Sequence, residues 1–153
     1  MTIRTGLLAL AVLAACAPTT TPSPQTQQRS TDAGMLPAPT PADVTVHITA
    51  AQDGQQVAVG VNQRFAIELV GVPTAGYQWA PAQLPPFITR AGEATGPTIA
   101  AQNQPGYAGG NHWEVTLFAA TSSGTGDIVM EQRRPWETNQ PPAHTFRVTI
   151  VAR

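Results

Sequence analysis

Cysteine, lysine and charged residues of either sign are scarce in this sequence. One cysteine, Cys16, occurs among 153 residues, and a single thiol cannot form a disulfide within the chain, so packing alone must hold the fold together. There is no lysine, charged residues make up 11% of the chain, and the formal net charge is −1. The arginines are scattered apart from the pair Arg133 and Arg134. No basic stripe is available to neutralise phosphates, so nucleic acid is not expected as a partner.

Amphipathic helical patterns are also missing, whereas glycine and proline are abundant, with 13 and 15 residues. This balance is typical of a turn-rich β-protein. Alternating apolar and polar residues predict short strands at residues 44–48, 56–59, 65–69, 77–79, 87–89, 112–118, 126–131 and 145–151. The side chains expected to face inward from two of these strands are Phe65, Ile67, Leu69, Trp113, Val115 and Leu117. We therefore predict an all-β fold, a β-sandwich of seven to eight strands, over residues 43–153.

The first fifteen residues have the parts of a bacterial export signal. Arg4 supplies positive charge, residues 7–13 form a short apolar run, and the ending Leu-Ala-Ala-Cys resembles the bacterial lipobox. The apolar run is too short to cross a bilayer, which needs about 20 apolar residues. We predict a signal peptide over residues 1–15, cleavage before Cys16 and acylation of that cysteine. An ordinary secretory signal with a cysteine near the cut is the alternative interpretation.

Residues 16–42 form a segment rich in proline, threonine and glutamine, with little to bury. This composition predicts a disordered, flexible tether. Acylation would consume the thiol of Cys16 and remove it as a candidate nucleophile. The expected location is the cell envelope, with the chain held at a membrane through its N-terminal lipid. Ala17, rather than aspartate, follows the cysteine, which favours the outer membrane in a Gram-negative cell.

The predicted loop at residues 71–79 contains the motif Pro73-Thr74-Ala75-Gly76-Tyr77. Proline fixes its own φ angle, and glycine allows a positive φ that a side chain would resist. The motif therefore predicts a rigid tip with small side chains. A tight turn followed by two core aromatics is the structural alternative.

Two further predicted loops are unusual for simple connections. The one at residues 95–111 is long for a compact domain and includes Gly109 and Gly110. The one at residues 133–143 contains Arg134-Pro135-Trp136, and arginine and tryptophan often dominate binding interfaces. A tryptophan folded back over the end of the sandwich is the alternative here. In a Greek-key arrangement all three loops would emerge at one end, as the binding loops of antibody variable domains do.

In this order the motifs resemble the chagasin-like inhibitors of papain-family cysteine peptidases. Members of that family carry an Asn-Pro-Thr-Thr-Gly-Tyr/Phe loop, a Gly-x-Gly-Gly loop and an Arg-Pro-Trp/Phe loop on an immunoglobulin-like β-sandwich. Residues 73–77 resemble the first loop and residues 134–136 the third, while Gly109 and Gly110 resemble the second. The resemblance extends over residues 44–153, and it implies the same immunoglobulin-like sandwich.

The resemblance also implies a mechanism, which is non-covalent occlusion of a papain-family cysteine peptidase. The tip at Thr74 and Ala75 would cover the catalytic Cys–His pair, with Trp136 against one rim and the glycine loop along the other. The implied peptidase-binding residues are Pro73, Thr74, Ala75, Gly76, Tyr77, Gly109, Gly110, Arg134, Pro135 and Trp136. A monomer is expected, without cofactor or metal. Val72 replaces the family's asparagine and Tyr107 its first glycine, and either change could weaken inhibition or shift the target.

Two other classes of function were weighed against inhibition. For an enzyme, candidate bases or metal ligands are His47, His112 and His144, but they occur singly and lack metal-binding spacing. Asp127 and Glu131 fit a turn and a solvated strand face better than a catalytic pair. The prediction is therefore a protein without catalytic residues. An envelope lipoprotein that docks another surface protein or a glycan is the alternative function.

Overall fold

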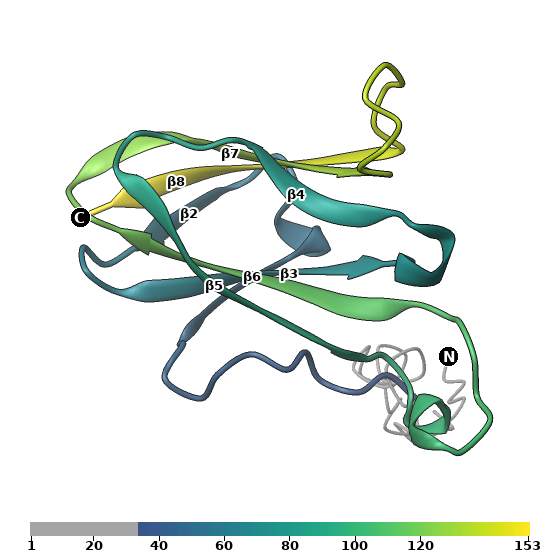
Figure 1. Ribbon diagram of the computed structural model, residues 1–153. Helices are drawn as coiled ribbons and strands as arrows, with labels where there is room; N and C mark the ends of the chain where they lie inside the picture. Colours follow the sequence, from purple (N-terminus) through teal and green to yellow (C-terminus); the bar gives the residue numbers. More distant parts are fainter. Residues whose placement is uncertain (1–33) are drawn as a thin grey trace, which may run out of the picture. The chain divides into compact units, whose positions relative to one another are not determined.

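The computed structural model describes residues 34–153. The predicted signal peptide, Cys16 and the predicted tether up to residue 33 lie outside the described residues. The described chain is all-β, as predicted, with eight strands in two sheets packed face to face (Figure 1). Within this part of the chain, no helix combines the length and apolar composition needed to cross a membrane.

Each sheet has four strands, in the order β1-β3-β6-β5 in the first sheet and β2-β8-β7-β4 in the second. The strands of the first sheet are β1 (Val46–Thr49), β3 (Arg64–Gly71), β5 (Ile88–Pro97) and β6 (His112–Ala120). Those of the second are β2 (Gln56–Val59), β4 (Gln78–Gln83), β7 (Gly124–Arg133) and β8 (His144–Ala152). The 3-10 helices are η1 (Ala50–Gln52), η2 (Pro73–Ala75) and η3 (Ala100–Asn103). Neighbouring strands are antiparallel except for β1 beside β3 and β2 beside β8.

The main core fills the space between the two sheets. Phe65 and Ile67 of β3 are buried, and Phe65 stacks on Phe118 of β6 with ring centroids 5.7 Å apart. The second sheet contributes Ile128, Met130, Val148 and Ile150 to the same cluster. These interlocking apolar side chains stabilise the pair of sheets without any disulfide, because burial of apolar area is the main favourable term in folding.

The face of β6 that carries Trp113, Val115 and Leu117 does not point inward, and that prediction is wrong. Val115 and Leu117 lie in a second apolar cluster with Val44, on the outer face of the first sheet. The inward face of β6 carries the alternate residues, among them Phe118. A strand buried on both faces has two apolar sets, and the sequence pattern alone did not say which set met the other sheet.

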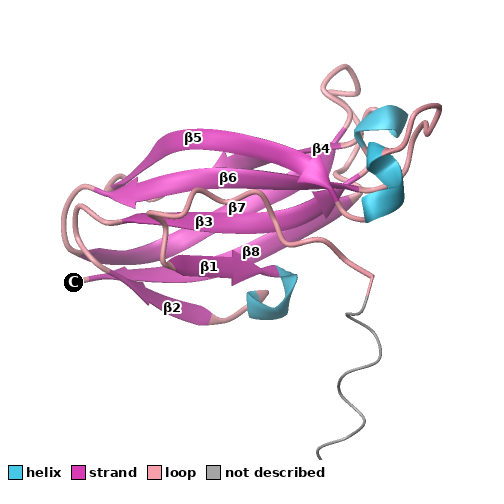
Figure 2. Ribbon diagram, turned by 90° about the horizontal axis from the view of Figure 1, so that it is seen from below, coloured by secondary structure: helices cyan, strands magenta, loops and turns pink. Residues whose placement is uncertain are grey.

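Residues 35–44, which we call the strap, cover this outer face. The strap crosses the first sheet without regular secondary structure up to residue 41, and a turn at residues 42–43 leads into β1 (Figures 1 and 2). Ala38 packs against the outer cluster, and Val44 is 3% exposed within it. The predicted boundary between tether and domain at residues 42 and 43 is therefore too late, because packing against the sheet begins near Leu36.

Candidate functional site

The three predicted loops emerge at the same end of the sandwich, on the right in Figure 1. Loop 1 (residues 72–77) joins β3 to β4. Loop 2 (residues 98–111) joins β5 to β6 and begins later than predicted, because β5 continues to Pro97. Loop 3 (residues 134–143) joins β7 to β8. The fold thus brings all the predicted peptidase-binding residues to one end.

Loop 1 is a single turn of 3-10 helix closed by its own backbone. The amide of Ala75 donates to the carbonyl oxygen of Val72 at 3.0 Å, and that of Gly76 donates to the carbonyl oxygen of Pro73 at 2.9 Å. Gly76 has a φ of +81°, in the left-handed region that glycine adopts freely. Val72 precedes the helix and makes no side-chain capping hydrogen bond. Thr74 and Ala75 are left exposed at the tip.

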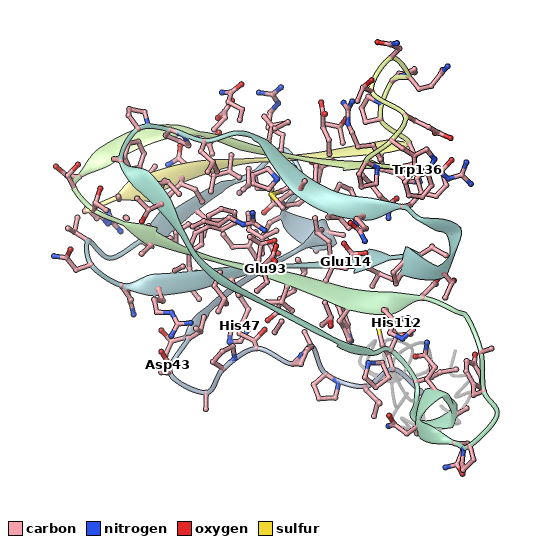
Figure 3. The ribbon with its side chains drawn as sticks, viewed as in Figure 1. Asp43, His47, Glu93, His112, Glu114 and Trp136 are labelled. Atoms are coloured by element: carbon pink, nitrogen blue, oxygen red, sulfur yellow. The ribbon has the colours of Figure 1, made fainter. Side chains whose placement is uncertain are left out.

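Loop 3 packs directly on loop 1 through Trp136. A Cβ atom placed on Gly76 would lie 2.3 Å from Cη2 of the Trp136 indole, so the ring lies against the glycine backbone. Trp136 is nevertheless 68% exposed, and it stands at the loop end of the domain (Figure 3). Glycine is therefore required at position 76 for two reasons: its positive φ angle and the close contact with the indole.

Arg134 links the same two loops by hydrogen bonding and stacking. Its Nε donates to the carbonyl oxygen of Ala75 at 2.9 Å, and its guanidinium lies 4.5 Å from the ring centroid of Tyr77. Its Nη1 donates to Oε1 of Glu137 at 2.9 Å, and this hydrogen bond raises the pKa of Arg134. Pro135 is exposed beside it. Glu137 was not predicted from the sequence, although its position three residues after an arginine is a usable signal.

Loop 2 is closed at its base by Gln102 of η3, a residue that the sequence analysis missed. Oε1 of Gln102 accepts hydrogen bonds from the amides of Thr98 and Ile99, at 2.7 and 3.0 Å. Its Nε2 donates to the carbonyl oxygen of Asn111 at 2.7 Å, on the opposite side of the loop. A glutamine among alanine and asparagine residues gives no sequence signal for such a bridge.

The glycines of loop 2 lie beside the tip of loop 1. Gly109 and Gly110 have φ angles of +82° and +91°. A Cβ placed on Gly109 would meet Oγ1 of Thr74 at 3.9 Å, and one on Gly110 would lie 3.3 Å from Oη of Tyr107. Loop 1 therefore lies between loop 2 and loop 3. Tyr107, which departs from the family pattern, is 44% exposed and covers Gly110.

A carboxylate lies at the base of loop 1, on the inward side of β6. Oε2 of Glu114 accepts a hydrogen bond from the backbone amide of Trp79 at 2.7 Å, while its buried Oε1 has no hydrogen-bond partner. A Cβ placed on Gly71 would overlap this oxygen, which explains the glycine at the end of β3. Burial raises the pKa of Glu114, and the Trp79 amide and nearby His112 oppose that shift (Figure 3).

Two of the three histidines, His47 and His112, and both acids of the predicted pair have structural partners, with Glu131 bonded to Arg133. His47 Nδ1 lies 2.5 Å from Oε1 of Glu68. His112 Nδ1 lies 3.3 Å from the carbonyl oxygen of Gly110. Hydrogen bonds from Thr149 and Arg147 lower the pKa of Asp127. Within residues 34–153, no three His, Cys, Asp or Glu side chains are grouped so that they could hold a metal ion.

Replacing Glu114 is expected to change how stability depends on pH. Because the folded-state pKa of Glu114 is raised above its unfolded value near 4.5, the folded protein binds more protons between the two values. The free energy of unfolding therefore falls as the pH rises through the raised pKa. Glu114→Gln keeps an acceptor for the Trp79 amide but cannot ionise, so this fall should disappear.

Chemical denaturation of both proteins from about pH 4 to about pH 8 measures the effect. Asp127 affects the free energy of unfolding in the opposite direction. Because its pKa is lowered in the folded state, its contribution to stability increases as the pH rises from acid. It is present in both proteins and cancels in the comparison. The same pH dependence in wild type and variant would contradict the role assigned to Glu114.

Comparisons with known proteins identify the family of this chain and agree with its fold. The family model described as chagasin family peptidase inhibitor I42 matches residues 58–150. The crystal structure of the cysteine protease inhibitor EhICP2 from Entamoeba histolytica is similar in fold, with a TM-score of 0.59 and 18% identity, covering 74% of this chain and 100% of that one. The solution structure of Amebosin is similar with a TM-score of 0.55 and 24% identity, covering 71% and 97%. Sequence comparison found no curated relative. The family match covers more than half of the chain, and the chain therefore belongs to the chagasin family of peptidase inhibitors.

Proposed function

We propose that this protein inhibits papain-like cysteine peptidases by inserting loops 1, 2 and 3 into the active-site cleft. One observation carries the proposal: the tip of loop 1 is exposed and is fixed from loop 3 by Trp136 and Arg134. Membership in a family of peptidase inhibitors supports it and makes the protein an inhibitor rather than an enzyme. EhICP2, which has the same fold, is itself described as a cysteine protease inhibitor.

The geometry explains why such inhibition needs no covalent step. Thr74 and Ala75 project between two flanking loops, so the tip can fill a cleft while its neighbours contact the rims. The tip is preorganised by the two backbone hydrogen bonds of η2, and loops that are already ordered lose little conformational entropy on binding. The same hydrogen bonds hold the tip out of the extended conformation. The inhibitor can therefore block the cleft without being consumed.

We further propose that the mature chain is lipidated on Cys16 and held in the cell envelope. The lipobox-like sequence at residues 13–16 and the short apolar run before it support this proposal. Ala17 supports an outer-membrane location in a Gram-negative cell. The inhibitor would then bind a papain-like peptidase at the membrane surface. We expect it to act as a monomer.

Trp136→Ala is expected to weaken inhibition strongly. Purified wild-type protein should inhibit papain at about micromolar concentration or below. Removal of a large exposed indole should raise the inhibition constant about 10-fold to 30-fold, the effect typical of an interface hot spot. Thr125→Ala, at the exposed start of β7 on the opposite end, is the matched control and should leave inhibition unchanged. Full papain activity at micromolar wild-type protein would reject the proposed function.

Gly76→Ala tests whether the contact between loops 1 and 3 matters beyond backbone strain. A side chain here needs a left-handed backbone, which disfavours alanine by about 1–2 kcal/mol, and it must also displace the Trp136 indole. Gly54→Ala is the matched control, because Gly54 has a φ of +71° with nothing within 4 Å of an added Cβ. Both variants should lose stability in thermal denaturation. Only Gly76→Ala should lose inhibition, and equal inhibition by the two variants would argue against the contact.

Cys16→Ala is expected to release the protein from the membrane. Wild-type protein from bacterial cells should partition into detergent and carry a lipid-modified N-terminal cysteine by mass spectrometry, whereas the variant should carry no lipid. The papain inhibition of the two proteins in detergent should be equal, because the cysteine lies outside the loops. A soluble wild-type protein with a free thiol would refute the lipid anchor and leave the proposed inhibition intact.

A further inference from the structure

The strap reaches the base of loop 2 with its N-terminal end. The amide of Leu36 donates to the carbonyl oxygen of Thr98 at 2.7 Å, and Nε1 of Trp113 donates to the carbonyl oxygen of Leu36 at 2.8 Å. Pro39 lies on the backbone of Gly96, where an added Cβ would meet its Cγ at 3.1 Å. The strap is therefore fastened to the two strands from which loop 2 emerges, β5 and β6.

The strap is held equally firmly at its other end. Thr40 donates a hydrogen bond to Glu68, and His47 contacts the same buried carboxylate at 2.5 Å (Figure 3). Arg64 donates to Asp43 at 2.9 Å. Prolines at 37, 39 and 41 restrict the backbone between these points, because proline fixes φ. A docked strap therefore has little freedom.

Thr98 connects the strap to loop 2 through hydrogen bonds. It is 5% exposed, its amide donates to Oε1 of Gln102, and its hydroxyl donates to the carbonyl oxygen of Asn111 at 2.9 Å. Gln102 in turn lies against Gly110, whose neighbour Gly109 faces Thr74 of loop 1. Hydrogen bonds thus connect Leu36 to the base of loop 2, and the glycines of loop 2 lie close to Thr74 at the tip of loop 1.

We propose that the strap is a positioning element for peptidase binding, which sets loop 2 against loop 1 in the geometry that enters the cleft. The inference rests on the proposed inhibitory function. The strap, at residues 35–44, lies outside the family match, which begins at residue 58. Loop 2 carries three glycines with positive φ, at 106, 109 and 110, and would lose much conformational entropy on binding if its base were free. The strap restricts the conformations at the base of loop 2 in the unbound inhibitor, so less conformational entropy is lost on binding.

Leu36→Pro is the test variant, and Leu36→Ala is its matched control. Proline removes the amide that donates to Thr98, whereas alanine keeps the amide and loses only the side chain. Loss of this hydrogen bond should raise the inhibition constant for papain about 5-fold to 10-fold relative to the alanine variant. It should also speed hydrogen exchange in residues 98–111 while leaving residues 134–143 unchanged.

Double-mutant cycles then separate positioning from general destabilisation. In a Tyr107→Ala background, where loop 2 has already lost its exposed side chain, Leu36→Pro should have a much smaller effect. In a Trp136→Ala background its effect should be undiminished, because loop 3 is fastened to loop 1 and not to the strap. Equal coupling to both loops would overturn the proposal, since it would indicate a loss of overall stability.

A second variant covers the case in which Leu36→Pro does not fold. Trp113→Phe keeps an aromatic ring on β6 but lacks the indole N–H that donates to Leu36, and it should give the same selective pattern. Leu36→Pro and Leu36→Ala inhibiting equally would refute the positioning role, with the inhibitory function still standing. Should wild-type protein fail to inhibit papain, hydrogen exchange still decides whether the strap orders loop 2, and unchanged exchange there would refute it independently.

Discussion

Burial of the first sheet on both faces is the constraint on which the rest of the structure depends. On one side β3 and β6 meet the second sheet through Phe65 and Phe118, and on the other Val115 and Leu117 meet the strap. A strand pair enclosed in this way cannot slip in register without moving apolar side chains into water. Loops 1 and 2 both begin or end on β3 or β6, so their positions are set by that packing. Without a disulfide in the described domain, no other element fixes them as strongly.

Packing rather than charge also decides how the loops hold one another. The ion pair between Arg134 and Glu137 has both side chains about one-third exposed, and solvent screening leaves such pairs with little effect on stability. The indole of Trp136 on Gly76, by contrast, allows no side chain between the loops at all. The main role of Arg134 is geometric, since it donates to a loop 1 carbonyl while it stacks on Tyr77. The arrangement of loops 1 and 3 should therefore be unchanged at high salt.

The sequence predicted the elements whose signal is local. Alternation identified the strands, Pro73 and Gly76 identified a tight turn, and the expected Greek-key order of the strands placed the three loops at one end. It misplaced the strap, because prolines and small residues such as Ala38 resemble tether composition and bury little area each. A signal was nevertheless present: residues 112–118 are apolar at Trp113, Val115 and Leu117 and also at Phe118, which is typical of a strand covered on both faces. The bridge made by Gln102 and the buried carboxylate of Glu114 depend on tertiary contacts and had no local signature.

The strap also determines where the proposed anchor joins the domain. Its first fastened residue, Leu36, lies beside Thr98 of loop 2, so the chain enters the domain at the end that carries the binding loops. From Cys16 to Gly34 the backbone can span at most about 65 Å, whatever its conformation, since each residue extends about 3.3–3.6 Å. A lipid on Cys16 would therefore keep Gly34, next to the N-terminal end of the strap, within that distance of the membrane. Attachment at the opposite end would have turned the loops outward by the full length of the sandwich. If the proposed lipid anchor is present, this entry point favours peptidases that act close to the membrane surface over those free in the surrounding medium.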